Sequence, residues 1–227
     1  MKNIIDINNL LFSYHKNQKV LDIPKLEIFE KDKIFLYGPS GCGKTTLLSI
    51  LTGILAANEG SVKVLNHEFV GLKPSLRDQI RGTEMGYIFQ LFNLIPYLTV
   101  LENILLPCKL NPLRRKNKTL SEIKEKCIEI AKNLNIAQIL SKKATEISIG
   151  QQQRVAAARA LLGDPKIIIA DEPTSSLDEE NRELFIQHLF EQCNTQNSSL
   201  IFVSHDINLK KLFSKQINLP ELNKVKI

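Results

Sequence analysis

The sequence predicts an α/β fold in which antiparallel strands come first and a helical segment interrupts a core of buried strands and helices. Three observations support this fold. Residues 3–8 and about 20–29 alternate or run apolar, as strands do. Two β-rich runs, Lys33–Gly38 and Pro165–Pro173, each end in a turn. The segment 92–160 between them has the apolar spacing of helices.

The N-terminal half contains strands and one helix. Lys33–Gly38 is expected to be a buried strand, and Gly43–Gly53 is expected to be a helix that stops at its last glycine. The runs 60–66 and Met85–Phe89 have the composition of further strands.

The central segment is predicted to be helical from about 99 to 145, with breaks at Pro107 and Pro112. Within it, Ser121–Leu134 repeats apolar residues at helical intervals. Its first residue, Ser121, is expected to cap this helix.

After the central helices the α/β pattern resumes. Pro165–Pro173 (PKIIIADEP) is an apolar strand that ends in two acids. A helix is expected over 181–193 and a strand over 198–205. The segment 92–160 is therefore interpreted as a helical insertion into an α/β core.

Length and composition indicate a globular protein. The chain has 227 residues, of which 43% are hydrophobic and 24% are charged. No apolar run approaches the roughly 18 to 20 residues that cross a bilayer. The start MKNIIDINN has no apolar region of the signal-peptide kind. A cytoplasmic protein is therefore expected.

Basic side chains outnumber acidic ones, 30 to 24, which gives a formal net charge of +6. The densest basic cluster is Leu113–Lys118 (LRRKNK). It has two interpretations, a solvated surface or a surface that attracts acidic lipids, phosphates or nucleic acid. Because no aromatic side chains are interleaved with it, nucleic-acid binding is not expected.

The four cysteines, Cys42, Cys108, Cys127 and Cys193, form no C-x-x-C pair, and no histidine stands at ligand spacing from them. A zinc site and a disulfide framework are therefore not expected. Cys42 lies inside a glycine-rich loop, and its thiol is expected to stay reduced in the cytosol.

That loop, Gly38–Thr45 (GPSGCGKT), matches the phosphate-loop pattern G-x-x-x-x-G-K-[ST]. Glycines let the backbone wrap an anion with its N–H groups turned inward, and the following helix directs the positive end of its dipole at that anion. Lys44 reaches the β- and γ-phosphates, and the Thr45 hydroxyl binds Mg²⁺. The residues expected to contact nucleotide here are Gly38, Pro39, Ser40, Gly41, Cys42, Gly43, Lys44, Thr45 and Thr46.

Two acids close the strand KIIIADEP. Asp171 ends the strand and is expected to face Mg²⁺. Strand alternation sends Glu172 to the opposite face, but the turn before Pro173 lets it swing towards the γ-phosphate and polarise a water. With the phosphate loop, these acids predict binding and hydrolysis of a nucleoside triphosphate with Mg²⁺.

The stretch Ile147–Leu161 (ISIGQQQRVAAARAL) supplies a second helix start. Ser148 is expected to cap the helix that begins near Gly150, which makes a second anion site. Two such starts on one chain suggest that one serves a nucleotide held by another copy. Ile149 stands where a tight turn prefers a small residue. It fits if that position has ordinary helical dihedral angles, and otherwise it weakens closure and slows the site.

Together these motifs resemble those of the ATP-binding cassette (ABC) ATPases, over nearly the whole chain from Ile4 to about Phe213. SIGQQQRVAAARAL is similar to their signature motif, with Ile149 in place of a glycine. The further matching positions are Tyr14, which stacks on adenine, Gln90 of the Q-loop, Asp178 of the D-loop (Ser175–Asp178) and His205, the switch histidine.

The resemblance implies a P-loop NTPase core with an N-terminal antiparallel β subdomain and an inserted α-helical subdomain, all in one domain over 1–227. The core is expected over 1–90 and 163–227, and the helical subdomain, with the signature motif, over about 91–162. The implied ligands are ATP and Mg²⁺, with Thr45, Gln90 and Asp171 at the metal.

The resemblance also implies a head-to-tail homodimer that closes on two ATP molecules. Glu172 would act as general base or orient the water, and Gln90 and His205 would contact the γ-phosphate, Mg²⁺ or the attacking water. The Gln90 loop would pass the nucleotide state to a membrane permease subunit on a separate chain. The residues that act across the dimer would be Ser148, Gly150 and Gln151.

The segment Gly86–Leu110 resembles one group of ABC ATPases, which serves lipoprotein release, macrolide and peptide export, and cell division. The expected function is therefore the ATP-hydrolysing subunit of an exporter or lipoprotein-release machine, on the inner face of the membrane. A cell-division-type ATPase that signals without transport and an amino-acid importer ATPase are the alternatives. Chromosome-maintenance ATPases, two-cassette translation factors and nucleotide kinases fit the motif set less well.

Overall fold

The computed structural model describes residues 2–15, 18–175 and 177–225, and the chain divides into two compact units. The first comprises Met1–Arg81 with Ile201–Ile227, and the second comprises Gly82–Leu200. The expected division at 1–90, 91–162 and 163–227 stays a prediction. No helix within the described ranges is long and apolar enough to cross a membrane.

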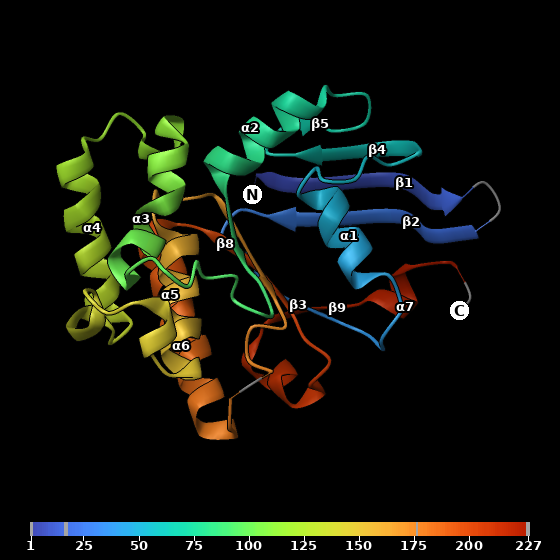
Figure 1. Ribbon diagram of the computed structural model, residues 1–227. Coiled ribbons are helices and arrows are strands. Elements are labelled where there is room, and N and C mark those ends of the chain that lie inside the picture. Colours follow the sequence, from blue (N-terminus) through green and yellow to red (C-terminus); the bar gives the residue numbers. More distant parts are fainter. Residues whose placement is uncertain (1, 16–17, 176, 226–227) are drawn as a thin grey trace. The chain divides into compact units, whose positions relative to one another are not determined.

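The first unit contains a four-stranded sheet in the order β2-β1-β4-β5 (Figure 1). β1 pairs antiparallel with β2 and with β4, so that Ile7 lies between Leu26 and Val62. All three side chains are buried, and this face of the sheet therefore covers core. The strands are β1 (Asn3–His15), β2 (Gln18–Phe29), β4 (Glu59–Val64) and β5 (His67–Glu68).

The first unit also holds the phosphate loop and its two flanking elements. β3 (Lys33–Tyr37) precedes the loop and pairs parallel with β9 (Lys215–Asn218), and α1 (Lys44–Leu51) follows the loop. The Phe35 ring of β3 packs against Phe202 and Phe213, with ring centroids 6.3 and 5.2 Å away. The first unit also contains η4 (Ile207–Leu212) and α7 (Leu219–Leu222), and the division from the second unit falls within α2 (Pro74–Glu84).

The larger sheet has the strand order β6-β7-β8-β3-β9. In the second unit, β6 (Met85–Ile88) and β7 (Ile167–Asp171) pair parallel. β8 (Ser199–Val203) contributes to both units, because the division falls within it. The antiparallel and parallel sheets confirm the predicted α/β class.

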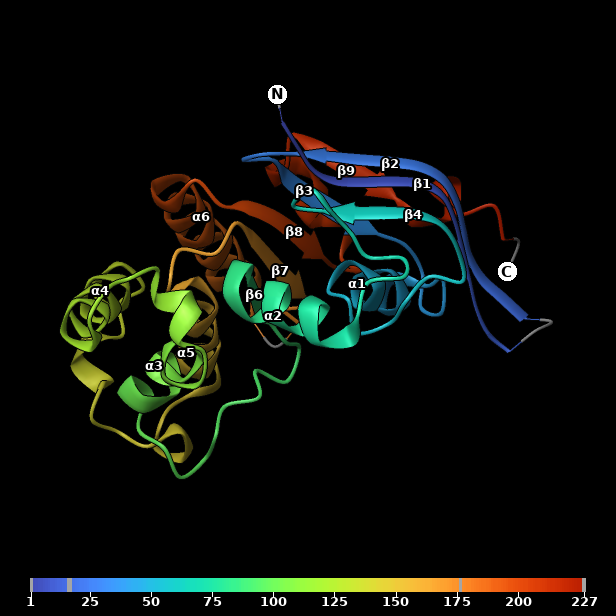
Figure 2. The same ribbon diagram turned by 90° about the horizontal axis from the view of Figure 1, so that it is seen from above.

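Helices dominate the second unit, and α3, α4 and α5 lie side by side in both views (Figures 1 and 2). Buried alanines let α5 approach β6 closely, so that a Cβ on Gly86 would lie 2.2 Å from the Ala160 carbonyl oxygen. The elements are α3 (Val100–Leu110), η1 (Pro112–Arg115), α4 (Leu120–Asn133), η2 (Ala137–Ile139), η3 (Ala144–Glu146), α5 (Ile149–Leu161) and α6 (Glu179–Gln196).

Two local predictions in the central segment are wrong. Pro107 does not break α3, because the helix continues past it and the Asn111 N–H donates to the Pro107 carbonyl at 3.0 Å. Packing of α3 against α4 and α5 outweighs the one backbone bond that proline removes. The cap of α4 is Thr119 rather than Ser121, since the Thr119 hydroxyl accepts from Glu122 N–H and the Glu122 carboxylate accepts from Thr119.

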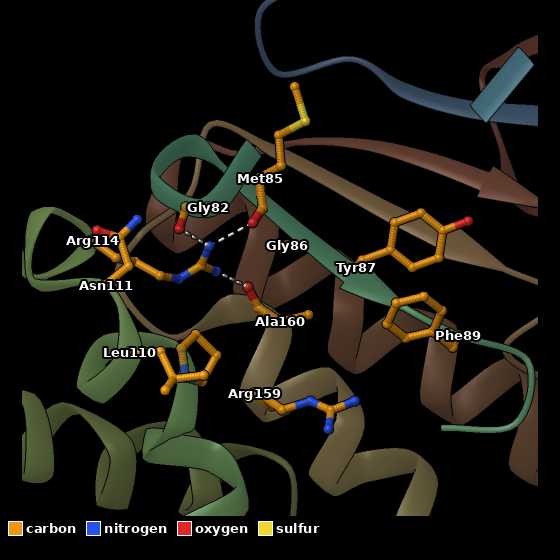
Figure 3. A pocket seen from close by; sticks show the side chains of 11 residues that line it. Gly82, Met85, Gly86, Tyr87, Phe89, Leu110, Asn111, Arg114, Arg159 and Ala160 are labelled. Atoms are coloured by element: carbon orange, nitrogen blue, oxygen red, sulfur yellow. Dashed lines mark hydrogen bonds between the residues drawn. The ribbon is translucent and has the colours of Figure 1, made fainter. Parts of the chain in front are cut away.

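The basic cluster Leu113–Lys118 is not a solvated surface at Arg114, whose exposure is 3%. The Arg114 guanidinium lies inside the second unit (Figure 3), and burial lowers its pKa. Lys116 and Lys118 both contact Asp164. Arg114, Lys116 and Lys118 of this cluster therefore contact other parts of the second unit. The main-chain carbonyl oxygens that accept from Arg114 belong to Gly82, Met85, Ala160 and Leu162.

Candidate nucleotide-binding site

The phosphate loop has the backbone conformation that its glycines predict. Gly41 and Gly43 have φ of +82° and +99°, in the left-handed region that favours glycine. A Cβ on Gly43 would also lie 2.8 Å from Leu21 Cδ2. Gly43 is the N-cap of α1 and supplies no side-chain acceptor, so its helix start is uncapped by a side chain. Such a start is suited to an anionic ligand.

Lys44 folds back over the beginning of the loop. Its Nζ donates to the carbonyl oxygens of Gly38 at 2.7 Å and Pro39 at 3.0 Å. The ammonium is therefore held at the loop by main-chain acceptors, where its positive charge favours a bound phosphate.

Tyr14 lies beside the loop. Its hydroxyl is 3.3 Å from Thr46 Oγ1, on the first turn of α1. Tyr14 is 56% exposed, and its ring is supported edge-on by Phe12, with centroids 4.9 Å apart. An exposed, supported ring next to a phosphate loop is a surface on which a base can stack.

His205 follows β8 in the first unit and is exposed. The turn that carries it is fixed on both sides, because Ser204 N–H donates to the Leu36 carbonyl and Asp206 N–H donates to Ser204 Oγ at 3.1 Å. The histidine is therefore presented by an ordered turn at the end of a strand.

In the second unit, the Asp171 carboxylate has a partner that sequence analysis missed. The Tyr87 hydroxyl, from the neighbouring strand β6, donates to Asp171 Oδ2 at 3.3 Å. Burial and the negative charge of Asp171 raise the pKa of Tyr87, which therefore stays a hydrogen-bond donor. The Tyr87 ring packs on Phe89, with centroids 4.3 Å apart (Figure 3).

Glu172 has a left-handed backbone conformation, with φ of +48°. This conformation is unfavourable for a residue with a side chain, and such strain is common at functional sites. The turn also ends the strand alternation after Asp171, as expected from the sequence. Direction of the Glu172 carboxylate towards a γ-phosphate stays a prediction.

The signature helix α5 begins as predicted, with Ser148 as its cap. Ser148 Oγ accepts from Gln151 N–H at 3.3 Å, and Gln151 Oε1 accepts from Ser148 N–H at 3.0 Å. Ile149 is the first helical residue, is 56% exposed and has no left-handed strain. The isoleucine therefore occupies an ordinary helical position with its side chain directed outward.

Gly150 lies close to the D-loop segment. A Cβ on Gly150 would meet only Leu177 Cδ2, at 3.7 Å. Asp178 caps α6 through Oδ1, which accepts from Asn181 N–H at 2.9 Å. Hydrogen bonds from Asn181 lower the pKa of Asp178, so the carboxylate is ionised and engaged as a cap. Ser176, also in the predicted D-loop, lies outside the described residues.

The structure thus forms two groups of predicted site residues. In the first unit, Tyr14 contacts Thr46, and Lys44 contacts Gly38 and Pro39. In the second unit, Gly150 adjoins the D-loop segment, while Gln90 follows β6 and is exposed.

Comparison with known sequences shows which protein family has this set of site residues. A family model described as ABC transporter matches residues 21–175. The chain is an ABC transporter ATPase. As a member of that family, this ABC ATPase is a subunit that hydrolyses ATP and works with a membrane permease.

Two curated relatives align with this chain over most of their own length. The lipoprotein-releasing system ATP-binding protein LolD of Buchnera aphidicola subsp. Schizaphis graminum is 36% identical over 200 residues, 87% of this chain and 85% of that protein. The bacitracin export ATP-binding protein BceA of Halalkalibacterium halodurans is 36% identical over 206 residues, 89% of this chain and 79% of that protein.

A solved structure confirms the fold of the ABC ATPase. The dimeric bacterial ABC transporter cassette MJ0796 superposes with a TM-score of 0.82 at 33% identity, covering 94% of this chain and 93% of that one. The same cassette is also known as a dimer in a post-hydrolysis state, bound to ADP and Pi.

Several internal residues of the ABC ATPase escaped sequence reasoning, among them Tyr87, Asn103, Arg114 and Arg159. The last three are buried polar side chains that bond to main-chain groups. The partners of Asn103 lie within 8 residues, whereas those of Arg114 and Arg159 lie 29 to 67 residues away. One signal was available for Arg159, because an arginine within the alanine run AAARAL must lie on a face that packs.

Proposed function

We propose that this ATPase powers a separate membrane permease of the export or lipoprotein-release type, as a homodimer on the inner face of the membrane. The observation that carries the proposal is its likeness to LolD over 85% of that protein's length. The likeness to BceA, an export ATP-binding protein, also supports a permease of the export type. Both agree with the resemblance of Gly86–Leu110 to that group.

ATP and Mg²⁺ fit the residues present. The left-handed glycines and the uncapped start of α1 suit a phosphate chain. The proposed metal ligands Thr45, Gln90 and Asp171 all offer oxygen, which Mg²⁺ prefers. No group of three or more His, Cys, Asp or Glu side chains suited to a metal occurs among the described residues. This donor set suits an ion that completes its shell with phosphate oxygens and water.

Each proposed site residue has a distinct task. Lys44 neutralises charge on the β- and γ-phosphates, and bound Mg²⁺ adds to that neutralisation. Glu172 accepts a proton from the attacking water or orients it. Gln90 and His205 hold that water and the γ-phosphate, and Tyr14 stacks on the adenine. The residues proposed to act from the partner subunit are Ser148, Gly150 and Gln151, and Asp178 of the D-loop is proposed to contact nucleotide.

The catalytic proposal is tested with Glu172→Gln. Turnover is expected to fall by about 100-fold or more, because the amide cannot accept the proton. ATP still binds, so an ATP-bound dimer should accumulate on size exclusion in the presence of Mg²⁺. Glu191→Gln, an exposed position on α6, is the matched control and should keep wild-type turnover. Unchanged turnover in Glu172→Gln would remove Glu172 from its proposed role.

The permease type is tested by capture. The Glu172→Gln protein, with ATP and Mg²⁺, is used as bait in detergent-solubilised native membranes. A co-purifying membrane subunit with a large extracytoplasmic domain is the expected result. A division or cell-wall protein would favour signalling without transport. An import permease with a substrate-binding partner would overturn the export proposal.

A further inference from the structure

Arg159 of α5 reaches the loop that follows Gln90. Its Nη1 donates to the Asn93 carbonyl at 2.7 Å, and its Nη2 donates to the Phe92 carbonyl at 2.5 Å. Arg159 is itself buried, at 8% exposure, and that burial lowers the pKa of its guanidinium. Two charge-assisted bonds from a fixed, planar group define the position of both acceptors.

The two acceptor residues have a strained backbone. Phe92 and Asn93 have φ of +58° and +49°, two consecutive residues with side chains in the left-handed region. Such a conformation persists only where surrounding contacts impose it. The Arg159 bonds go to the carbonyl oxygens of these same two residues, so they are suited to impose it.

Asn103 of α3 fixes the second half of the same loop. It is fully buried, its Oδ1 accepts from Ile95 N–H at 2.8 Å, and its Nδ2 donates to the Ile95 carbonyl at 3.1 Å. The loop therefore has one buried anchor from each of two helices. On either side of the anchored residues the loop is exposed, with Leu91 at 83% and Tyr97 at 73%.

The anchor from α5 has a particular consequence, because α5 is also the helix that begins at Ser148. A displacement of α5 moves the Arg159 guanidinium, and with it the carbonyl oxygens of Phe92 and Asn93. These residues follow Gln90 by two and three positions. The position of the Gln90 side chain is thereby tied to the position of the signature helix.

We infer that Arg159 is a positioning residue for Gln90, which links the signature helix to the Gln90 loop by holding the left-handed pair Phe92–Asn93. This inference rests on the proposed role of Gln90 in hydrolysis. Arg159 touches no reacting atom and acts through the loop backbone alone.

The link itself is tested by hydrogen exchange on the nucleotide-free protein. Arg159→Lys keeps the charge but loses the fork that reaches two carbonyls, so amides of residues 91–98 should exchange about 10-fold faster. Arg154→Lys is the matched control on the same helix, since Arg154 donates to the Leu134 carbonyl and not to this loop. Unchanged exchange over 91–98 in Arg159→Lys overturns the link, whatever the activity.

Whether the Arg159 contacts affect hydrolysis through Gln90 is tested by a double-mutant cycle on ATP turnover. Arg159→Lys is expected to lower kcat about 10-fold and to change KM for ATP by less than about two-fold. In a Gln90→Ala background, Arg159→Lys should lower kcat by a further factor of less than about two. Fully additive losses would mean that Arg159 acts by another route. A Gln90→Ala variant with normal turnover would instead contradict the proposed role of Gln90.

Two further variants keep the test decisive. Asn93→Gly in the Arg159→Lys background should restore part of the lost turnover, because glycine adopts positive φ without support. If Arg159→Lys does not fold, Asn93→Pro replaces it, since proline cannot adopt positive φ and Asn93 is exposed. Asn93→Pro should lower kcat and be non-additive with Gln90→Ala, and normal turnover in Asn93→Pro would overturn the inference.

Discussion

The starts of α1 and α5 are both proposed to meet phosphate, but they are built in opposite ways. α1 begins at Gly43, whose left-handed backbone supplies no side-chain cap, and Lys44 adds a positive charge. α5 begins at Ser148, whose hydroxyl and N–H are both engaged with Gln151 in a capping box.

This difference suggests an order of events. An anion at α1 finds donors that no side chain satisfies, so nucleotide binding to one subunit needs no rearrangement of caps. An anion at α5 that binds the N–H of Ser148 or Gln151 competes with the Ser148–Gln151 bonds, which are worth about 1 kcal/mol. The α1 site is therefore suited to bind first, and the α5 site is suited to respond when a second subunit presents a bound nucleotide.

Lys44→Ala should have the largest effect on this comparison. Removing the charge over the phosphate loop is expected to lower ATPase activity by roughly 100-fold or more. Binding of a fluorescent ATP analogue to the monomer should fall as well, because the α1 site acts in that state. Tight binding by the variant would mean that the uncapped helix start suffices alone.

Ser148→Ala should have a smaller and different effect. ATP turnover is expected to fall about 10-fold through loss of one hydrogen bond to a charged ligand. Analogue binding to the monomer should be unchanged, because the α5 site is proposed to act only across the dimer. A loss of monomer binding as large as that in Lys44→Ala would erase the contrast between the two helix starts.

Thr119→Ala is the matched control, because Thr119 and Glu122 form the same kind of capping box on α4. Both cap variants should lower the free energy of unfolding by about 1 kcal/mol, measured by urea denaturation. Only Ser148→Ala should also lower turnover. Equal turnover losses would show that the effect arises from helix stability rather than from a ligand contact.

Ile149→Gly should have the smallest effect. Ile149 occupies an ordinary helical position and is exposed, so removal of its side chain costs little packing and lowers helix propensity by less than about 1 kcal/mol. ATPase activity is expected to equal or exceed that of the wild type. A collapse of activity would make the isoleucine a required part of the α5 site.

Local patterns were enough to predict both helix starts. The glycine spacing in Gly38–Thr45 indicated a strand, a loop and a helix, and Ser148 was recognised as a cap because capping depends on neighbouring residues. The Ser121 cap failed for a related reason. Thr119 and Glu122 stand at capping-box spacing, and Thr119 starts the helix two residues earlier.

Features set by distant contacts could not be predicted. The short strand β9 (Lys215–Asn218) has no strong periodic pattern of its own, and it exists because β3 pairs with it. The Arg159 bonds join residues 66 and 67 positions apart, so no local spacing contains them. The roles assigned to Glu172, His205 and Gln90 stay predictions.

The burial of all four cysteines has a practical consequence for spectroscopy. Because Cys42, Cys108, Cys127 and Cys193 are shielded in the folded state, a single cysteine introduced on an exposed position accepts a maleimide dye selectively. Burial raises the pKa of the Cys127 thiol to about 12, which further suppresses its reaction at neutral pH. Site-specific fluorescence can therefore follow this chain with its native cysteines in place.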